Sequence, residues 1–346
     1  MATIKDVARL AGVGLGTASR ALSGKGSVSA AALDKVLKAA AELDFRPSHA
    51  ARTPHSGNSQ MIGVYIPSLN GTFHTPILQA IYSELRAEGL NMVVSFGVGD
   101  ADSRQQAIEG VDFLLARGCD GLLLMSNALH DSDIVALGPD KSRLAVINHE
   151  YASIPGQCFP VDHVLGGRLA ARSLLDLGHR RIAVIAGPAG VPDNAQRLAG
   201  FMSELDAAGI DTAQLWMTGS DFTSAGGSEA ARKLLGSDYG FTALFCANDE
   251  MAIGALSCFQ QMGVAIPGQV SVLGYDDTNS TKFTVPRLSS VHIPWGDLAE
   301  NGLNYLLNSC YGLGRPVRRH FPLSVTLRAS LSKAPARRGA PDSVLR

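Results

Sequence analysis

The chain has 346 residues, of which 46% are hydrophobic, and its formal net charge is −1. This length allows a large buried core and more than one domain. The five cysteines are scattered and include no C-x-x-C pair, which argues against a disulfide framework and a thiolate zinc site. Neither a secretory signal nor an apolar run of about 18 residues is apparent. We therefore expect a cytoplasmic protein without a membrane partner, a metal or a cofactor.

The charge is unevenly distributed. Residues 1–53 carry eight basic and four acidic side chains, a net charge of +4, which leaves −5 for the rest of the chain. A small basic head on a mildly acidic body is the pattern expected when a polyanion-binding module is attached to another domain.

Three helices are predicted in the first 46 residues. Thr3 and Asp6 have the spacing of a capping box, and a helix over 4–11 follows, ended by Gly12. A second helix is expected over about 15–22. Ser29 can cap a third helix, which stops before Pro47. Its predicted apolar stripe consists of Leu33, Val36, Leu37, Ala40 and Leu43.

The glycines around Gly12 and Gly14 raise the possibility of a phosphate-binding loop. Thr17 stands where a G-x-G-x-x-G motif needs its third glycine, and a helix pattern rather than a strand precedes it. The residues around Lys25 also fail the P-loop pattern. A helix-turn-helix with its turn at Gly12–Gly14 fits better, and a small helical bundle without a ligand is the alternative.

Beyond residue 46 the pattern changes twice. Residues 47–60 are polar, with Pro54 and Gly57, and are predicted to be a hinge or linker. Residues 61–332 then alternate short apolar runs with helical stretches, which predicts a body of two doubly wound parallel α/β subdomains. We expect these to span about 61–161 plus 292–321 and 162–291 plus 322–332. The tail, 333–346, is expected to be disordered.

The stretch "TIKDVARLAGVGLGTASRALSGKGSVS…AAAELDFRPSHAAR" resembles the DNA-binding head of the LacI/GalR family of bacterial repressors. In the body, "LGHRRIAVIAGP", "AQRLAGF", "ALFCANDEMAIGAL" and "VSVLGYDDT" resemble motifs of the same family in the same order. The resemblance covers nearly the whole chain. It implies a helix-turn-helix head on a body like that of the periplasmic binding proteins.

The resemblance also implies which head residues contact double-stranded operator DNA. Leu15, Gly16 and Arg20 lie where the family reads bases, and Arg20 can bind guanine with both arms of its guanidinium. Thr3, Thr17, Ser19 and Lys25 lie where the family contacts phosphates. Arg52 belongs to the hinge, where Pro54 replaces the leucine that usually enters the minor groove. Because proline cannot continue a helix, we hypothesise that this protein bends its operator less than its relatives do.

Polar residues that follow strands predict a small-molecule site between the two subdomains. Arg197 and Asp276 offer a forked donor and an acceptor, which suit vicinal hydroxyl groups of a sugar, and a purely structural ion pair is the less favoured alternative. Asn248 closes another strand. Phe73 and Phe222 could cover an apolar face of a ring, and His149 and Asp162 are weaker candidates at the mouth of the cleft. Trp295 is expected to pack at a hinge crossover rather than on a ligand, and Asp249 and Asp277 to be cap and turn residues.

These observations together predict a transcriptional regulator, not an enzyme, because no catalytic or metal motif appears. A sugar or glycoside is the expected effector by resemblance alone, with a purine or nucleoside as the alternative. A sugar-binding body without DNA-linked regulation is the other alternative. A homodimer is expected, since one head reads only a few base pairs. The helix of "HTPILQAIYSELRAEG" could supply the dimer face through Ile77, Ile81 and Leu85, or these residues could pack on the sheet.

Overall fold

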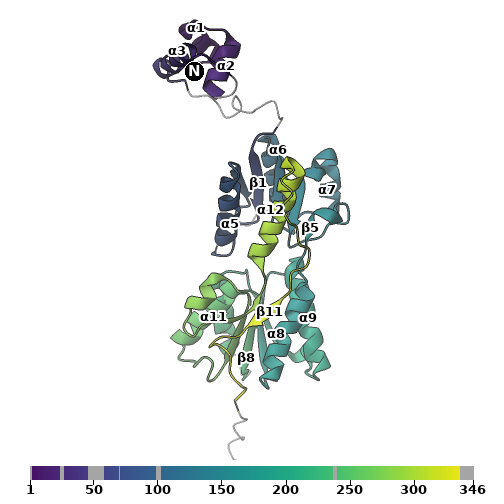
Figure 1. Cartoon of the computed structure of the whole chain (residues 1–346). Helices are drawn as coiled ribbons and strands as arrows, with labels where there is room; N and C mark the ends of the chain where they lie inside the picture. The colour runs from purple at the N-terminus through teal and green to yellow at the C-terminus, as the bar shows by residue number, and fades with distance from the viewer. Residues whose placement is uncertain are drawn as a thin grey trace, which may run out of the picture. The chain divides into compact units, whose positions relative to one another are not determined.

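The computed structural model describes residues 2–23, 27–45, 58–69, 71–98, 103–236 and 240–335. The chain forms two compact units, Met1–Met61, the head, and Ile62–Arg346, the body (Figure 1). The expected hinge residues Arg52 and Pro54, together with Lys25, lie outside the described residues.

The head is a three-helix unit with α1 at Ile4–Ala11, α2 at Leu15–Ser23 and α3 at Ala30–Glu42. The first helix has the predicted limits, and the expected capping box is present: Asp6 N–H donates to Thr3 Oγ1 and Thr3 N–H donates to Asp6 Oδ2. Gly12 ends α1 with φ of +65°, in the left-handed region that favours glycine. These features are those of a helix-turn-helix.

The predicted apolar stripe of α3 is partly wrong. The helix buries Val36, Ala39 and Ala40, whereas Leu33 and Leu37 are 38% and 51% exposed. Small side chains from α1 and α2 fill most of the core, so α3 contacts them through a narrow stripe. Leu33 and Leu37 lie on the flank of that stripe, where helical periodicity alone cannot tell a buried from an exposed position.

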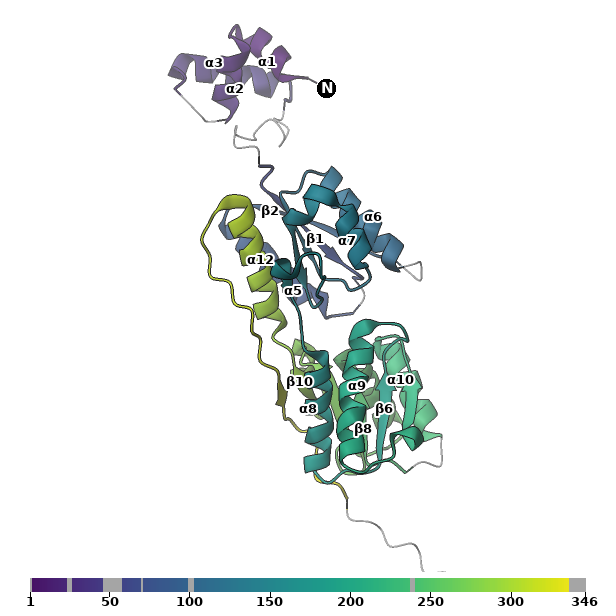
Figure 2. The ribbon, with the colours of Figure 1, turned by 90° about the vertical axis from the view of Figure 1, so that its right-hand side faces the viewer.

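The body consists of two lobes, each built on one sheet (Figure 2). Lobe 1 has the strand order β2-β1-β3-β4-β5, and its sheet pairs are parallel where the register is defined. Its strands are β1 (Met61–Ile66), β2 (Asn91–Phe96), β3 (Gly121–Leu124), β4 (Leu144–Ile147) and β5 (Cys158–Phe159), and its helices are α5 (His74–Ala87), α6 (Ser103–Ala116), α7 (Asp131–Ala136) and α12 (Trp295–Tyr311).

Lobe 2 has the strand order β11-β10-β9-β8-β6-β7, and only the β10–β11 pair is antiparallel among its described pairings. Its strands are β6 (Ile182–Ala186), β7 (Trp216–Gly219), β8 (Ala243–Cys246), β9 (Ser271–Asp276), β10 (Ser289–His292) and β11 (Ser324–Thr326). Its helices are α8 (His163–Asp176), α9 (Pro192–Ala207), α10 (Ser224–Leu235) and α11 (Asp249–Gln261). The alternation of short apolar strands and helices expected over residues 61–332 is confirmed by these elements.

Both sheets place their loops in the same way. In lobe 1 the chain leaves β1 for the edge strand β2 and returns to β3 on the other side, and in lobe 2 it leaves β6 for β7 and returns to β8. Each sheet therefore has a switch point, where the loops after adjacent strands diverge and ligands usually bind in parallel α/β folds.

Two expectations about the body can be compared with the structure. Ile77, Ile81 and Leu85 of α5 are at most 5% exposed and belong to the core, so the second alternative holds: they pack on the sheet and do not form a dimer face. The start of the tail is ordered, since Ala334 N–H donates to the carbonyl of Leu177 (2.8 Å) at the end of α8, where a helix leaves its last carbonyls without partners. Residues 336–346 lie outside the described residues.

Candidate functional site

The second helix of the head presents an exposed face. Its first turn begins after Gly14, whose carbonyl accepts from the Thr17 and Ala18 amides as an N-cap carbonyl does. Ala18 and Ala21 point into the head core, while Leu15, Gly16, Ser19 and Arg20 are exposed and Thr17 is half-buried. The helix therefore packs through one side, and the residues predicted for base reading lie on its exposed side.

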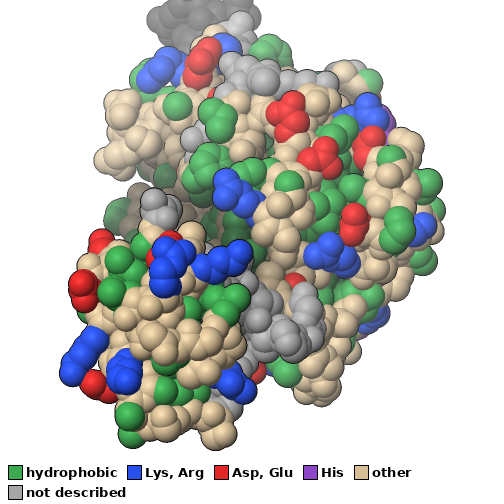
Figure 3. Space-filling model, turned by 90° about the horizontal axis from the view of Figure 1, so that it is seen from above, with side chains coloured by type: hydrophobic (Ala, Val, Ile, Leu, Met, Phe, Trp, Pro, Cys, Tyr) green, Lys and Arg blue, Asp and Glu red, His purple; other side chains and the backbone are tan. Residues whose placement is uncertain are grey.

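The small side chain at position 16 is not required by packing. A Cβ added to Gly16 would meet no atom within 4 Å, so the head has room there for a larger residue. Thr3, by contrast, uses its hydroxyl in the capping box, where it also donates to Asp6 Oδ2 (2.7 Å). In Figure 3, Lys and Arg side chains are interspersed with Asp and Glu on the visible face instead of forming one continuous basic patch.

Arg197 is the centre of the polar cluster in lobe 2. It lies in the first half of α9, is 5% exposed, and donates from Nη1 to the carbonyl of Ala247 at the end of β8 (2.6 Å). Its guanidinium also lies over the Tyr275 ring, 4.2 Å from the centroid, and 6.0 Å from that of Phe222. Arg197 thus spans the switch point between β6 and β8.

Two glycines allow Arg197 to reach this position. A Cβ on Gly200 of α9 would lie 1.9 Å from the Val164 carbonyl oxygen of α8, and one on Gly167 of α8 would lie 2.0 Å from the Arg197 carbonyl oxygen. The two helices therefore pack backbone against backbone, which places the start of α8 beside Arg197. His163, the first residue of α8, has its Nδ1 3.4 Å from Arg197 Nε.

Asp276 completes the cluster at the end of β9. Its Oδ1 lies 3.6 Å from Arg197 Nη2, is buried, and has no hydrogen-bond partner among the described residues. Burial raises the pKa of this carboxyl group to about 7 although the Arg197 guanidinium opposes the rise. The backbone φ of +103° is unusual for a non-glycine residue, and such conformations often occur at binding sites.

The other residues predicted for the effector site lie at different distances from Arg197. Phe222 adjoins Arg197, and its carbonyl accepts from Asn248 Nδ2 (3.0 Å), whose Oδ1 caps α11 at Met251 (2.9 Å). Phe73 of lobe 1 packs edge-to-face on Trp295, with centroids 5.0 Å apart. Trp295 follows a lobe crossing, as expected, and its Nε1 is buried without a hydrogen-bond partner in the described structure.

His149 and Asp162 are not brought to this cluster. His149 is half-buried and packs edge-on against Tyr151, with centroids 4.6 Å apart, and burial lowers its pKa. Asp162 is exposed and caps α8 by accepting from Leu165 N–H (2.8 Å). Within the described structure, neither residue makes a hydrogen bond or ring contact with Arg197, Phe222 or Asp276.

Sequence reasoning missed a network that joins the lobes. Asp193 at the start of α9 accepts from Asn127 Nδ2 (2.7 Å) and from Asn148 Nδ2, both of lobe 1. His163 is 1% exposed, with Nε2 2.8 Å from Asn148 Oδ1 and Nδ1 2.9 Å from the Tyr275 hydroxyl. Asn127 and Asn148 both follow buried strands, the signal that led to Asn248 and Asp276.

The expectations for Asp249 and Asp277 concern the same region of lobe 2. Asp249 lies fully buried in the first turn of α11 and accepts from Thr278 N–H (2.6 Å) and Ser290 Oγ (2.6 Å). Asp277 pairs with Arg328 (2.7 Å) and accepts from Thr326 Oγ1 (2.8 Å). Both carboxylates are thus bonded within lobe 2, in structural positions.

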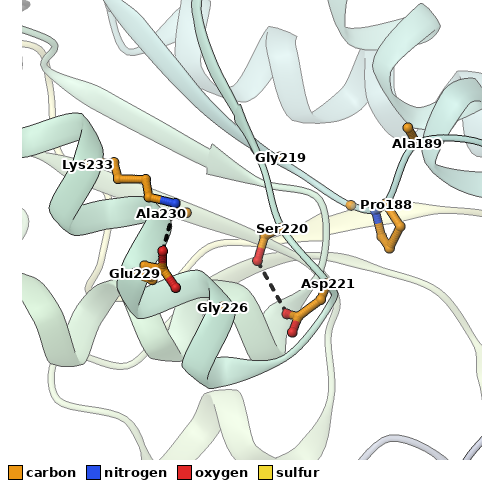
Figure 4. Close-up of a pocket in the computed structure, with 10 residues that line it drawn as sticks. Pro188, Ala189, Gly219, Ser220, Asp221, Gly226, Glu229, Ala230 and Lys233 are labelled. Carbon is orange, nitrogen blue, oxygen red and sulfur yellow. Dashed lines mark hydrogen bonds and ion pairs between the residues drawn. The ribbon is translucent and has the colours of Figure 1, made fainter. Parts of the chain in front are cut away.

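A separate hollow of about 360 Å³ lies at the carboxyl ends of β6 and β7 (Figure 4). Its charged side chains bond to near neighbours: Lys233 pairs with Glu229 on α10 (2.7 Å), and Asp221 accepts from Thr223 Oγ1 (2.7 Å). Because this hollow offers a ligand fewer unsatisfied groups than the Arg197 cluster does, we place the candidate effector site at Arg197. Across the described residues, no group of three or more His, Cys, Asp or Glu could hold a metal ion, and no helix is long and apolar enough to cross a membrane.

Comparison with known proteins matches both units of the chain. Residues 3–48 match the model of bacterial regulatory proteins of the lacI family, and residues 171–331 match the periplasmic binding protein-like domain. The transcriptional regulator GalS of Salmonella typhimurium is 31% identical over 312 residues, covering 90% of this chain and 91% of GalS. The repressor PurR of Erwinia tasmaniensis is 30% identical, covering 89% and 90%.

Solved structures of lacI-family regulators are similar to this chain as well. A LacI-family regulator from Burkholderia phymatum is 42% identical with a TM-score of 0.75, covering 79% of this chain and 99% of that one. The lac repressor dimer bound to operator and an anti-inducer is 28% identical with a TM-score of 0.76, covering 95% and 98%. The regulator CelR in complex with cellobiose is 28% identical with a TM-score of 0.65, covering 95% and 100%.

A helix-turn-helix head joined to a two-lobed body with a polar cluster at its switch point defines a DNA-binding transcriptional regulator with an effector-binding domain. The sequence and structural similarities extend over both units. The chain belongs to the lacI family of bacterial regulatory proteins, and it is therefore a transcriptional regulator, not an enzyme.

Proposed function

We propose that this protein is a repressor whose affinity for a specific operator is controlled by a neutral sugar or glycoside bound between the two lobes. The observation that carries the proposal is the Arg197–Asp276 cluster: a buried forked donor beside a buried carboxylate oxygen without a hydrogen-bond partner in the described structure. Adjacent hydroxyl groups of a sugar can accept from the first and donate to the second.

The charges at the site favour a neutral ligand over an anionic one. Asp276 lies 3.6 Å from Arg197, and the network that contains Asp193 brings a second carboxylate close to it. A phosphorylated ligand would find no excess positive charge there. Phe73, Phe222 and Trp295 supply apolar ring faces, which suit a pyranose and equally a purine. The ligand screen below therefore includes purines.

For the head, we propose that Leu15, Gly16 and Arg20 contact base edges in the major groove. Thr3, Thr17, Ser19 and Lys25 would contact phosphates, and Arg52 and Pro54 would contact the operator at the hinge. The exposure of α2 on one side and its packing on the other support this assignment.

A homodimer would present two heads to two half-sites. Since Ile77, Ile81 and Leu85 are buried, we place the dimer face on the outer side of the same region. There α5 exposes Tyr82 (48%), the edge strand β2 ends at exposed Phe96 (43%), and exposed Val98 (71%) follows it. Exposed apolar residues beside a strand edge are suited to burial against a second copy.

The proposal is tested in two steps with the full-length protein. A thermal-shift screen with hexoses, pentoses, disaccharides, hypoxanthine and guanosine should yield a sugar that raises the melting temperature. The same sugar should change the affinity for duplex DNA selected from a random pool by at least fivefold. A purine as the only hit would replace the effector class, and the absence of any selected DNA sequence would refute the repressor function.

A further inference from the structure

Glu250 of lobe 2 reaches across to lobe 1. It lies in the first turn of α11, and its Oε1 accepts from both Thr72 N–H (3.0 Å) and Thr72 Oγ1 (2.6 Å) in the loop after β1. Its Oε2 accepts from Ser224 Oγ of α10 (2.6 Å). Burial would raise the pKa of Glu250, but these hydrogen bonds outweigh it and lower the pKa. One ionised carboxylate thus joins a loop of lobe 1 to two helices of lobe 2.

The loop held by Glu250 carries the aromatic side of the candidate site. Thr72 immediately precedes Phe73, whose ring packs edge-to-face on Trp295 and on His74, with centroids 5.0 and 4.8 Å apart. The backbone comes close to the carboxylate as well, since a Cβ on Gly71 would lie 3.4 Å from Glu250 Oε1. Moving Glu250 away would remove both hydrogen bonds that it accepts from Thr72, directly before Phe73, and would leave the longer contact of Thr72 Oγ1 with Ser280 Oγ (3.3 Å).

Two ring nitrogens beside Phe73 are buried. Trp295 Nε1 and His74 Nδ1 are both inaccessible and make no hydrogen bond among the described residues. Burying an N–H group or a ring nitrogen without a hydrogen-bond partner costs free energy. Two such nitrogens side by side are not expected where the contact has only a structural role. The aromatic side is thus built in a form that suits a ligand.

We propose that Glu250 is a positioning residue that holds the Phe73 loop against lobe 2, and so keeps the aromatic side of the effector site, which lobe 1 supplies, beside the Arg197 cluster of lobe 2. This inference rests on the proposed function, because it takes Phe73 and Trp295 as part of the effector site. Glu250 itself makes no contact with Arg197 or Asp276 in the described structure. It acts on the ligand through Thr72 and Phe73.

The inference is testable without knowing the effector. The chain has two tryptophans, so a Trp216→Phe background leaves Trp295 as the only one. In that background of the full-length protein, Glu250→Ala should at least double the acrylamide quenching constant of Trp295. Glu250→Gln keeps an oxygen for Thr72 and should quench like the parent. Glu229→Ala removes the same charge from an exposed pair within α10 and should also quench like the parent.

Unchanged quenching in Glu250→Ala would overturn the inference, and so would an equal increase in Glu229→Ala. If Glu250→Ala fails to give a cooperative melt, Thr72→Val tests the same contact from lobe 1, because it removes one of the two donors. Thr72→Val should then raise the quenching constant by a smaller factor, and no increase would overturn the inference. These measurements need neither DNA nor sugar, so their outcome is distinct from a failure of the proposed function, which shows as an empty ligand screen.

Discussion

The guanidinium of Arg197 lies 3.6 Å from the carboxylate of Asp276, within ion-pair distance but beyond a hydrogen bond. Both side chains are almost completely buried, at 5% and 7% exposure. Arg197 satisfies Nη1 at the Ala247 carbonyl, whereas Asp276 Oδ1 finds no partner in the described structure. A purely structural ion pair would be expected to close this gap, since an unsatisfied buried carboxylate oxygen is costly. The open geometry favours a pair that a ligand completes.

Removing either partner should therefore abolish the effector response. We expect Arg197→Ala and Asp276→Asn each to weaken binding of the sugar found in the screen by at least 100-fold, about 3 kcal/mol, as measured by isothermal titration calorimetry. Arg172→Ala is the matched control, because Arg172 of α8 forms a solvent-exposed pair with Glu204 of α9, and such surface pairs contribute little. Full binding by both site variants would show that the effector binds elsewhere.

The stability of the protein should carry a pH dependence from Asp276. Its pKa rises from the usual 3.8 to about 7 on folding because burial disfavours the charged form. The folded state therefore holds a proton that the unfolded state has lost, and this contribution to stability disappears as the pH rises from about 4 to about 7. Between pH 5 and 8 the parent should lose about 2–3 kcal/mol more than Asp276→Asn. Urea unfolding at the two pH values measures the difference, and parallel losses would contradict it.

The crossing of α8 and α9 should be intolerant of a methyl group. A Cβ on Gly200 would collide with the Val164 carbonyl at 1.9 Å, and backbone cannot move aside as a side chain can. We expect Gly200→Ala to lower the free energy of unfolding by about 1–3 kcal/mol and to weaken sugar binding, since it separates α9, which carries Arg197, from α8. Gly219→Ala, where a Cβ meets nothing within 4 Å, should change neither quantity. Equal stabilities of the two variants in urea would contradict the close-packing argument.

Periodicity and turn chemistry were sufficient to predict the alternation of strands and helices and the limits of α1. The expectation that polar residues near the carboxyl ends of strands form a site singled out Asn248 and Asp276, which lie just after β8 and at the end of β9. It did not reveal the partners of Asp193, because which loop of lobe 1 meets lobe 2 depends on how the two sheets face each other. That arrangement is a property of the assembled body, not of any local stretch.

Three of the predictions depended on packing that the sequence pattern does not show. The spacing of Ile77, Ile81 and Leu85 shows which face of α5 is apolar but not whether its own sheet or a second chain covers that face. Leu33 and Leu37 were predicted to be buried but are exposed, because the head core is small and filled largely by alanines. Trp295 was placed correctly at a crossing, but only its three-dimensional surroundings show its unpartnered Nε1.

The proposed dimer face gives a test that is independent of any ligand. Tyr82→Glu and Val98→Glu each place a charge on the outer side of α5 or beside the edge strand β2, where a second copy would have to desolvate it. We expect the double variant to weaken dimerisation at least tenfold in sedimentation equilibrium. Val135→Glu on α7, where Val135 is 52% exposed, is the control and should leave the dimer intact. An unaffected double variant would place the dimer contact on another surface.

The last prediction concerns how the head reads sequence. Arg20 is exposed on the face of α2 opposite Ala18 and Ala21, and a guanidinium there can bind guanine O6 and N7 together. On DNA selected by the parent protein, Arg20→Ala should lower affinity about 10- to 100-fold, and repeated selection should lose one preferred base in each half-site. Lys38→Ala is the control, because it removes an equal charge from α3 and not from α2. Lys38 pairs with Asp34 on α3 (2.9 Å), and its removal should at most weaken binding to all DNA sequences alike. If Arg20→Ala selects the same sequence with the same affinity, α2 does not read bases through Arg20, and the readout would have to come from Leu15 or from the hinge.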